Sequence, residues 1–288
     1  MRQIKIFKLW FLAFIALLIN ITVSIEAHPS SNLEELKKSV VKIEVSLPNN
    51  KETGAGIIVA ADTEKVYIMT AYHVIHEFVD TDSGDKTINI QFFSNRQKSV
   101  PGEVFKRFDE DLDLAVVTVK KQDIKDFEII PINEIGDVKK VKELEEIITI
   151  GHPGSTPWGL AKGNVSKIQT NYFLFSGNAV YPGNSGGMLL NRGKYLIGMV
   201  IGRGAEIGRA LRIDVAFDKL RDEWGIPVAV KAIPISPDKP WWKNKYFIAV
   251  AVVVGSGTTG IILYNLSKNP KDNPVVLDVP PYFPGEEP

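Results

Sequence analysis

The sequence predicts an all-β fold with few helices. Its apolar segments are short, contain many Val and Ile residues, and are separated by turns that contain Gly and Asn. One of them, Lys42-Ile43-Glu44-Val45, alternates polar with apolar residues, which is typical of a strand with one solvated face. Many short strands joined by turns favour barrels or sandwiches over a parallel sheet.

The expected strands fall into two similar halves, joined by a polar connector at residues 121–142. The first half contains strands at 40–46, 54–60, 66–70, 88–93, 100–105 and 114–120. The second half contains strands at 147–150, 161–169, 172–175, 188–191, 195–201 and 209–213. A capping box at Ser31-Asn-Leu-Glu34 predicts a short first helix, and residues 215–224 predict an amphipathic closing helix.

The N-terminal segment, residues 1–27, has the pattern of an export signal. Arg2, Lys5 and Lys8 precede an uncharged run at residues 9–25, and cleavage after Ala27 would fit this pattern. The run is also long enough for an uncleaved N-terminal anchor. Both interpretations place the domain that follows outside the cytoplasm, in the periplasm if the source is bacterial.

The C-terminal part contains a second uncharged apolar run, at residues 246–267. Its 22 residues suit a transmembrane helix, and Trp241, Trp242 and Tyr264 flank it as interfacial aromatic residues would. A buried core helix is the alternative. Residues 228–245 are expected to be a linker, and the proline-rich residues 268–288 a disordered tail.

Composition excludes several classes of function. Thirty-four basic and 34 acidic residues give a formal net charge of zero, so nothing indicates a nucleic-acid partner. The chain has no cysteine, which excludes disulfides, thiol nucleophiles and thiolate metal sites. Neither HExxH nor HxxEH occurs, and no metal or other cofactor is expected.

Gly183-Asn184-Ser185-Gly186-Gly187 is the first candidate for chemistry. Glycines around a serine permit positive φ angles and leave space for a substrate, so backbone N–H groups can form an oxyanion hole. A glycine-rich hairpin is the structural alternative. A serine nucleophile also needs a base, and the chain has only four histidines, His28, His73, His76 and His152.

Position along the chain narrows the choice of base and acid. His28 lies at the expected signal junction and His152 in a Gly-His-Pro-Gly turn, which leaves His73 and His76 after an apolar strand. The segment Asp109-Glu-Asp-Leu-Asp113 enters another apolar strand, and Asp113 lies closest to that strand. Asp109 and Glu110 are expected to lie in a solvated turn. Gly183–Gly187 also fits the G-x-S-x-G pattern of α/β-hydrolases, but no histidine follows Ser185.

The order His, Asp, Ser is the order of chymotrypsin-like double barrels. Thr53-Gly-Ala-Gly, Thr70-Ala-Tyr-His-Val, Asp113-Leu-Ala-Val, Ile150-Gly-His-Pro-Gly and Gly183-Asn-Ser-Gly-Gly occur in the order expected of trypsin-like peptidases. Over residues 33–226 the chain resembles the bacterial HtrA/Do-like branch. The resemblance implies a first barrel at about 33–120 and a second at about 143–226.

This resemblance also implies a catalytic role for each motif residue. His73 would be the general base, Asp113 its partner and Ser185 the nucleophile, with an oxyanion hole formed by the N–H groups of Gly183 and Ser185. His76 is then a helix residue. HtrA-like proteins usually carry a PDZ domain after the protease, whereas only a linker, an apolar run and a tail are expected here.

By analogy with the fold, the first substrate pocket is expected to contain Ala179, Val180, Val200, Ile201 and Gly202. These residues offer no carboxylate for Lys or Arg, so we expect cleavage after a small or medium aliphatic residue. The leading hypothesis is a membrane-tethered serine endopeptidase that cleaves polypeptides outside the cytoplasm, in envelope protein quality control or regulated proteolysis. The alternative is a catalytically silent module of the same fold that binds peptides or scaffolds a membrane complex.

Overall fold

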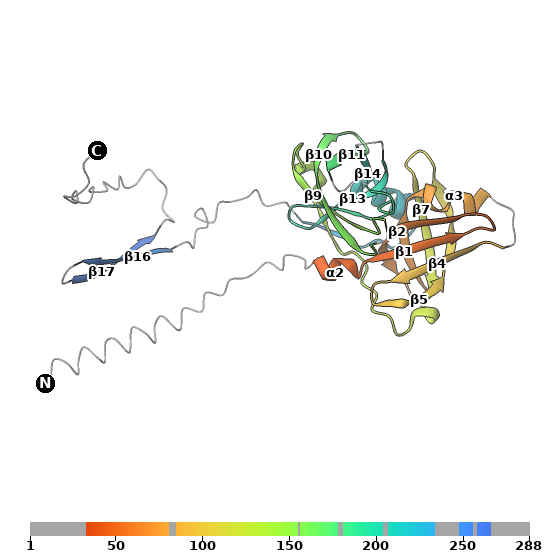
Figure 1. Cartoon of the computed structure of the whole chain (residues 1–288), viewed down its shortest axis with the longest axis horizontal. Helices are drawn as coiled ribbons and strands as arrows, with labels where there is room; N and C mark the ends of the chain where they lie inside the picture. The colour runs from red at the N-terminus through yellow and green to blue at the C-terminus, as the bar shows by residue number, and fades with distance from the viewer. Residues whose placement is uncertain are drawn as a thin grey trace. The chain divides into compact units, whose positions relative to one another are not determined.

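The computed structural model describes residues 33–80, 85–154, 156–177, 181–203, 207–233, 248–255 and 258–265. The chain divides into two compact units, residues 1–235 and residues 236–288, and each is described by itself. Two large sheets lie within the first unit and a two-stranded sheet within the second. The expectation of an all-β fold with few helices is confirmed (Figure 1).

The first sheet, called barrel 1, has seven strands in the order β5-β4-β1-β2-β3-β7-β6. Its strands are β1 (Val40–Ser46), β2 (Lys51–Ala61), β3 (Lys65–Thr70), β4 (Thr87–Phe92), β5 (Asn95–Pro101), β6 (Glu103–Asp109) and β7 (Leu114–Lys120). The pairings between these strands are antiparallel. β5 and β6 stand at opposite ends of the order but are separated in sequence by Gly102 alone, so this sheet closes on itself.

Gly102 makes this closure possible. Its N–H donates to Ile88 O at 2.8 Å, which continues the pairing with β4 as the chain turns toward β7. A Cβ atom here would lie 2.8 Å from Val117 Cγ1, 3.0 Å from Ile90 Cγ1 and 3.1 Å from Ile88 Cγ2. A side chain at position 102 would therefore have to displace buried neighbours at the point where the sheet closes.

The second sheet, called barrel 2, has eight strands in the order β12-β9-β10-β11-β14-β13-β8-β15. Its strands are β8 (Glu134–Gly136), β9 (Glu146–Gly151), β10 (Gly159–Ile168), β11 (Tyr172–Gly177), β12 (Met188–Asn191), β13 (Leu196–Arg203), β14 (Gly208–Arg212) and β15 (Lys231–Ile233). An additional pairing of β12 with β13 closes the ring, and β8 and β15 extend it in parallel.

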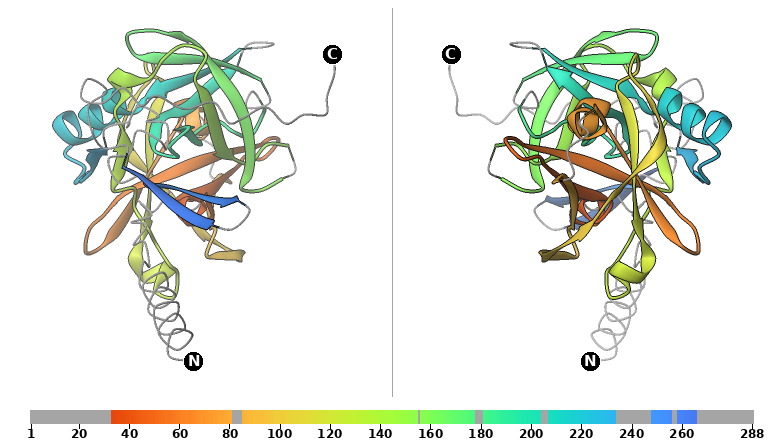
Figure 2. Two further views of the ribbon diagram at one scale, coloured as in Figure 1. Left: turned by 90° about the vertical axis from the view of Figure 1, so that its left-hand side faces the viewer. Right: turned by 90° about the vertical axis from the view of Figure 1, so that its right-hand side faces the viewer.

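The helices among the described residues are short. They are α2 (Leu33–Lys37), α3 (Tyr72–Asp80) and α4 (Ile213–Asp218), with single turns η1 (Lys121–Ile124) and η2 (Val138–Lys140) and the π-helical η3 (Lys219–Glu223). α4 runs directly into η3, and Figure 2 shows this pair, in cyan, on the outside of the first unit. It occupies the position of the predicted closing helix.

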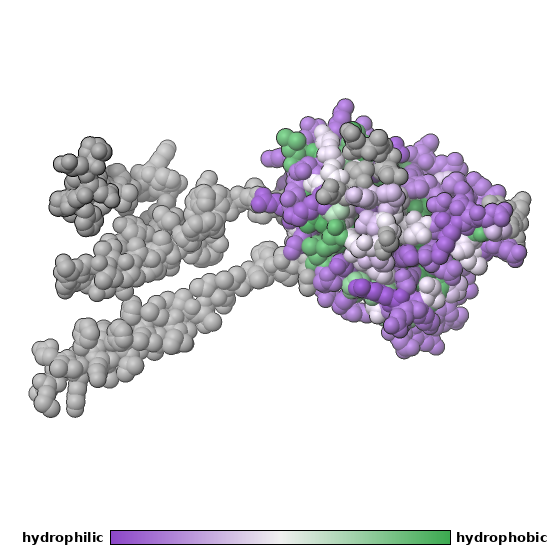
Figure 3. Space-filling model, in the orientation of Figure 1, coloured by the Kyte–Doolittle hydropathy of each residue, from purple (hydrophilic) through white to green (hydrophobic). Residues whose placement is uncertain are grey.

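Apolar residues from both sheets form one continuous core. Among its fully buried aromatic side chains are Phe92 of barrel 1 and Phe173, Phe175 and Phe217 from the second half. The face seen in Figure 3 is mostly hydrophilic, with separate small apolar patches. β1 has one face in the core and one toward solvent. Ile43 and Val45 are buried, whereas Lys42 and Glu44 form an ion pair on the other face.

The structure differs from the predicted strands at three places. The strand predicted at 100–105 is two strands, β5 and β6, because the chain changes partners at Gly102. β8 was not predicted, and β15 lies within the predicted linker. Both are three residues long and pair at a sheet edge, so neither has enough residues to show a period of two.

The transmembrane helix predicted at 246–267 is not confirmed, because the described residues of this run form two strands. β16 (Ile248–Gly255) and β17 (Thr258–Asn265) pair antiparallel, from Ile248 opposite Asn265 to Gly255 opposite Thr258. The Val and Ile residues of both segments favour strands because they are branched at Cβ. Within the described part of the chain, no helix combines the length and apolar character needed to cross a membrane. Residues 1–27 and 268–288 lie outside the described residues.

Substitution of Gly102 tests the closure of barrel 1. Gly102→Ala is expected to destabilise the protein by about 1–3 kcal/mol, because a methyl group must displace buried Ile and Val side chains. Urea unfolding followed by far-UV circular dichroism measures the change. Gly202→Ala is the matched control, since a Cβ there meets nothing within 4 Å. Equal stability of the two variants would show that the closure tolerates a side chain.

Candidate active site

The structure brings His73 and Asp113 into direct contact. His73 Nδ1 lies 2.7 Å from Asp113 Oδ2, and the His73 backbone N–H donates to Asp113 Oδ1 at 2.8 Å. A carboxylate oxygen accepts, so the hydrogen is on Nδ1 and the Nε2 lone pair is left for another proton. The Asp113 side chain is 14% exposed, against 44% for His73, so the acid lies beneath the imidazole.

The backbone of Asp113 is as specific as its side chain. Its φ angle is +55°, in the left-handed region, which aspartate tolerates better than most residues. Its carbonyl oxygen accepts the Tyr72 N–H at 3.2 Å. Asp113 thus binds two consecutive N–H groups in the first turn of α3, which have no partner within the helix. The helix start and the imidazole are fixed by one residue.

Barrel 2 and the closing helix hold the segment that carries Asp113. Tyr172 Oη donates to Asp111 O at 2.9 Å, and Lys219 Nζ lies 2.9 Å from Asp109 Oδ2. Burial opposes ionisation of Asp109, but the Leu112 N–H and the Lys219 ammonium outweigh it, and the pKa of Asp109 is lowered. The expectation that Asp109 is merely solvated is therefore wrong, whereas Glu110 is exposed as expected.

The segment around Ser185 requires its glycines. Gly183 has φ +89° and Gly186 φ +82°. A Cβ at Gly183 would lie 2.1 Å from His152 O, and one at Gly186 would lie 2.0 Å from Ala55 O. Since both obstacles are backbone atoms, no side-chain rotation could relieve them. The pentapeptide is a turn packed against both barrels, and a simple hairpin is excluded.

Hydrogen bonds of this turn separate its N–H groups into two sets. Gly186 N–H donates to Val200 O at 2.7 Å and Gly187 N–H to Asn184 O at 2.8 Å. Within the described part of the chain, the N–H groups of Gly183 and Ser185 donate to no protein acceptor. Two backbone donors next to a serine hydroxyl match the chemical requirement for binding an oxyanion.

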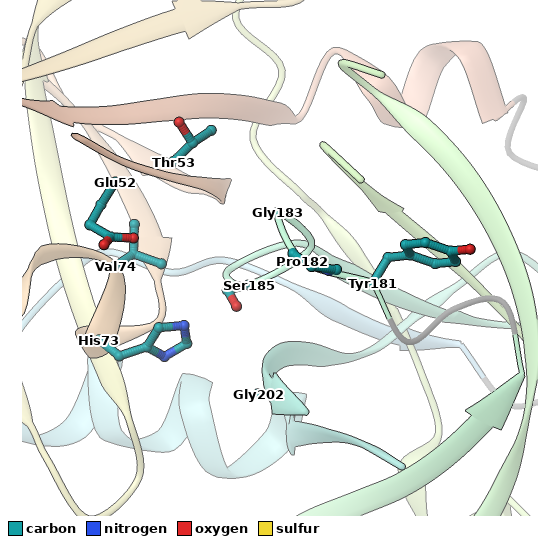
Figure 4. A pocket seen from close by; sticks show the side chains of 9 residues that line it. All are labelled: Glu52, Thr53, His73, Val74, Tyr181, Pro182, Gly183, Ser185 and Gly202. Atoms are coloured by element: carbon teal, nitrogen blue, oxygen red, sulfur yellow. The ribbon is translucent and has the colours of Figure 1, made fainter. Parts of the chain in front are cut away.

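His73, Gly183 and Ser185 line one cleft with a volume of about 250 Å³. Figure 4 shows Ser185 with its hydroxyl on the side of the cleft where the His73 ring lies. Of the hydrogen bonds between described residues, none joins Ser185 Oγ to His73; such contacts are often longer without substrate. The remaining lining residues are Glu52, Thr53, Val74, Tyr181, Pro182 and Gly202.

Of the residues expected in the first substrate pocket, the structure places only Gly202 in the lining of this cleft. Val200 and Ile201 are buried, and the Val200 backbone bonds to Gly186 and Gly187. Ala179 and Val180 lie outside the described residues. The preference for an aliphatic residue before the cut bond stays a prediction.

His152 connects the turn at residues 183–187, called the serine turn, to barrel 1. Its backbone N–H donates to Gly183 O at 3.1 Å, and its Nδ1 accepts the Trp158 N–H at 3.1 Å. Nε2 therefore carries the hydrogen, which it donates to Val41 O at 3.0 Å in β1. Trp158 Nε1 adds a parallel bond to Val40 O at 2.8 Å. His152 is a structural bridge between the barrels as well as the turn residue expected from sequence.

The second histidine of α3, His76, lies outside the contact between His73 and Asp113. Its Nδ1 is 2.8 Å from His73 O, as expected of a helix residue. Within the described ranges, no three His, Asp or Glu side chains gather where they could hold a metal ion.

The sequence motifs contain most of the residues that line the cleft but missed Glu52, Tyr181 and Pro182. Tyr181 and Pro182 directly precede the glycine-rich pentapeptide, and Glu52 directly precedes the motif that begins at Thr53, so proximity in sequence could have indicated them. Tyr172 and Lys219 act on the acid-bearing segment from 61 and 110 residues away along the chain. No local pattern indicates such distant contacts.

Comparison with known proteins finds related sequences. The trypsin-like peptidase domain family matches residues 54–199. A Staphylococcus aureus (strain USA300) protein described as "Serine protease HtrA-like" is 34% identical over 196 residues, covering 59% of this chain and 24% of the relative. The corresponding protein of strain bovine RF122 / ET3-1 is 32% identical with the same coverage. The chain therefore spans about a quarter of the length of these curated relatives.

Solved structures show the same fold. Deg5 has a TM-score of 0.55 and 22% identity, covering 68% of this chain and 94% of that chain. The serine endoprotease from Yersinia pestis has a TM-score of 0.51 and 22% identity, covering 65% of this chain and 63% of that chain. These likenesses confirm the double β-barrel expected from sequence.

The bridge formed by His152 has a predicted pH dependence. Burial lowers the pKa of His152 from 6.5 to about 4, and its bond to Val41 O only partly opposes this. Between these values the unfolded chain binds a proton that the folded chain excludes, so stability falls as pH decreases from 6.5 to 4. The difference amounts to about 3 kcal/mol at the acid end.

Urea unfolding at pH values from 4 to 8 measures this contribution. His152→Gln should lower stability at pH 8, because it breaks the bridge, and should flatten the dependence on pH. His76→Gln is the control, because it removes a histidine that is only partly buried, and it should retain the wild-type slope. An unchanged slope in His152→Gln would contradict a buried neutral His152.

Proposed function

This chain belongs to the trypsin-like peptidase domain family, and from that premise we propose that it is a serine endopeptidase with His73, Asp113 and Ser185 as its catalytic triad. The observation that carries the proposal is the double contact of Asp113 with His73, at the ring and at the backbone. His73 and Ser185 line the same cleft, so the imidazole oriented by Asp113 and the serine hydroxyl can act on one substrate.

The chemistry follows from these positions. His73 Nε2 accepts the Ser185 proton as Oγ bonds to the substrate carbonyl carbon, and the carbonyl π electrons move to oxygen. The N–H groups of Gly183 and Ser185 bind the resulting oxyanion. Collapse breaks the C–N bond, and His73 returns its proton to the leaving amine. Water then repeats the cycle on the acyl-enzyme, which frees Ser185.

The alternative is a catalytically silent module of this fold that binds peptides or scaffolds a membrane complex. The separation of Ser185 Oγ from hydrogen-bond contact with His73 is the observation in its favour. The orientation of His73 by Asp113 favours catalysis, because a peptide-binding module has no need of a fixed imidazole tautomer.

We further propose that the protein is tethered to the membrane with its barrels outside the cytoplasm. Arg2, Lys5 and Lys8 favour a cytoplasmic N-terminus, so the apolar run at 9–25 would carry the following domain across. The uncharged run at 246–267 is a second candidate for membrane contact. A role in envelope protein quality control or regulated proteolysis fits this location.

Removal of single triad residues tests the catalytic proposal. Ser185→Ala and His73→Ala should each reduce kcat for casein or peptide cleavage by about 10⁴-fold or more while the fold is retained. Asp113→Asn should also be severe, since an amide N–H directed at Nδ1 would favour the wrong tautomer. Initial rates on a fluorogenic peptide give kcat, and circular dichroism verifies folding.

Two neighbours provide matched controls. Asp111→Asn and His76→Ala change the same residue types nearby and should have mild effects, because neither side chain contacts the His73 ring. Near-normal turnover by folded Ser185→Ala would refute the mechanism. A crippled Asp111→Asn beside an active Asp113→Asn would move the acid to Asp111.

The location is tested by protease accessibility in spheroplasts. An epitope tag after Asp238 should be digested by external protease, because it follows the exported barrels. A tag after Pro288 should be protected if the run at 246–267 returns the chain to the cytoplasm. Digestion of both tags would leave the N-terminal segment as the sole tether, and release of the protein by osmotic shock would refute tethering.

A further inference from the structure

Glu52 introduces a negative charge into the catalytic cleft. It lies near the start of β2 and is half-buried, and it lines the cleft with Thr53, His73 and Val74 on the barrel 1 wall. Figure 4 shows its carboxylate on the same side of the cleft as His73, across from Tyr181 and Pro182. Among the described lining residues it is the only carboxylate.

No cation of the described residues neutralises the charge of Glu52. Its Oε1 accepts a hydrogen bond from Asn50 Nδ2 at 3.2 Å, and an amide carries no charge. The adjacent Lys51 bonds instead to Glu44, with Nζ and Oε1 3.3 Å apart. Within the described ranges, no Lys, Arg or His forms an ion pair with Glu52. A cationic group in the cleft would therefore find an available partner.

In the proposed mechanism, the wall with Glu52 and His73 faces the substrate residues after the cut bond. His73 must return a proton to the leaving amine, so the substrate residues after the cut bond pass the imidazole. Glu52 lies on the wall that carries His73. By analogy with the fold, the acyl part binds beside Gly202 and the serine turn, which line the rest of the cleft with Tyr181 and Pro182. Glu52 thus faces the leaving part of the substrate.

Distance along β2 indicates which substrate residues it reaches. Ala55 N–H donates to Ser185 O at 2.7 Å, which fixes β2 against the nucleophile. Glu52 precedes Ala55 by three positions, or about 10 Å of extended strand. An extended substrate advances at the same rate, so its first three residues after the cut bond span this distance.

We propose that Glu52 selects substrates with Lys or Arg within the first three residues after the cut bond. This inference rests on the proposed endopeptidase activity and assigns a specificity to the same cleft. This preference for a cation differs from the aliphatic preference predicted on the acyl side of the cut bond.

A matched set of fluorogenic peptides tests the proposal. The peptides share one acyl side and carry Lys, norleucine or Glu at the first, second or third position after the cut bond. The quantity measured is the ratio of kcat/KM for the Lys peptide to that for the norleucine peptide, since norleucine has a similar length without charge. A partly exposed ion pair predicts a ratio of roughly 5 at the best position, decreasing with added salt.

Two variants of Glu52 and one control identify the residue responsible. Glu52→Gln should bring the ratio to about 1, and Glu52→Lys should make the Glu peptide the preferred substrate. Glu77→Gln is the control, because Glu77 also accepts from Asn50 Nδ2, at 2.8 Å, but does not line the cleft. It should keep the wild-type ratio.

Hydrolysis of a small uncharged active-site ester distinguishes a failure of the Glu52 specificity from a failure of the endopeptidase activity. Hydrolysis of the ester with a wild-type ratio near 1 at every position would overturn the specificity of Glu52 and leave the endopeptidase intact. A high ratio that persists in Glu52→Gln would do the same. Failure of wild-type protein to hydrolyse both the ester and all peptides would overturn the proposed function and this inference with it.

Discussion

The carboxylate of Asp113 contacts His73 at two atoms, and the position of the imidazole depends on both. One oxygen accepts from the backbone N–H and the other from ring Nδ1. Charge-assisted hydrogen bonds of this kind contribute about 1.5–3 kcal/mol each. Because the Asp113 carbonyl also binds the Tyr72 N–H, the start of α3 and the orientation of its second residue are set together.

This arrangement makes the site a product of both barrels. Asp113 and His73 belong to barrel 1. The serine turn belongs to barrel 2, and Ser185 O accepts a hydrogen bond from the Ala55 N–H in β2. His152 ties the same turn to β1, and Tyr172 holds the segment that carries Asp113. A shift of one barrel against the other would therefore separate His73 from Ser185.

Much of this site could be predicted from the order and spacing of its motifs. Glycines at 183 and 186 indicated a turn with positive φ, and the structure shows why, since backbone oxygens of His152 and Ala55 occupy the space of a side chain. The contacts of Tyr172, Lys219 and Trp158 could not be predicted, because each joins residues far apart in sequence. Glu52 was missed because no sequence motif contains it, and only the structure shows that it lines the cleft.

The apolar run at 246–267 shows a different limit. Length and lack of charge indicated a membrane helix, but β-branched residues dominate the segments at 248–255 and 258–265, which pair as strands. Length and hydropathy alone do not distinguish the two conformations. The proposal of a membrane tether therefore depends most on the basic and apolar pattern of residues 1–27.

Activation of Ser185 by His73 and Asp113 is tested most directly by a fluorophosphonate probe, because only an activated serine reacts readily. Intact-mass analysis followed by peptide mapping identifies the modified residue. We expect one adduct per chain, on Ser185, that is lost in folded His73→Ala. Absence of the adduct from folded wild-type protein, or equal labelling of His73→Ala, would contradict it.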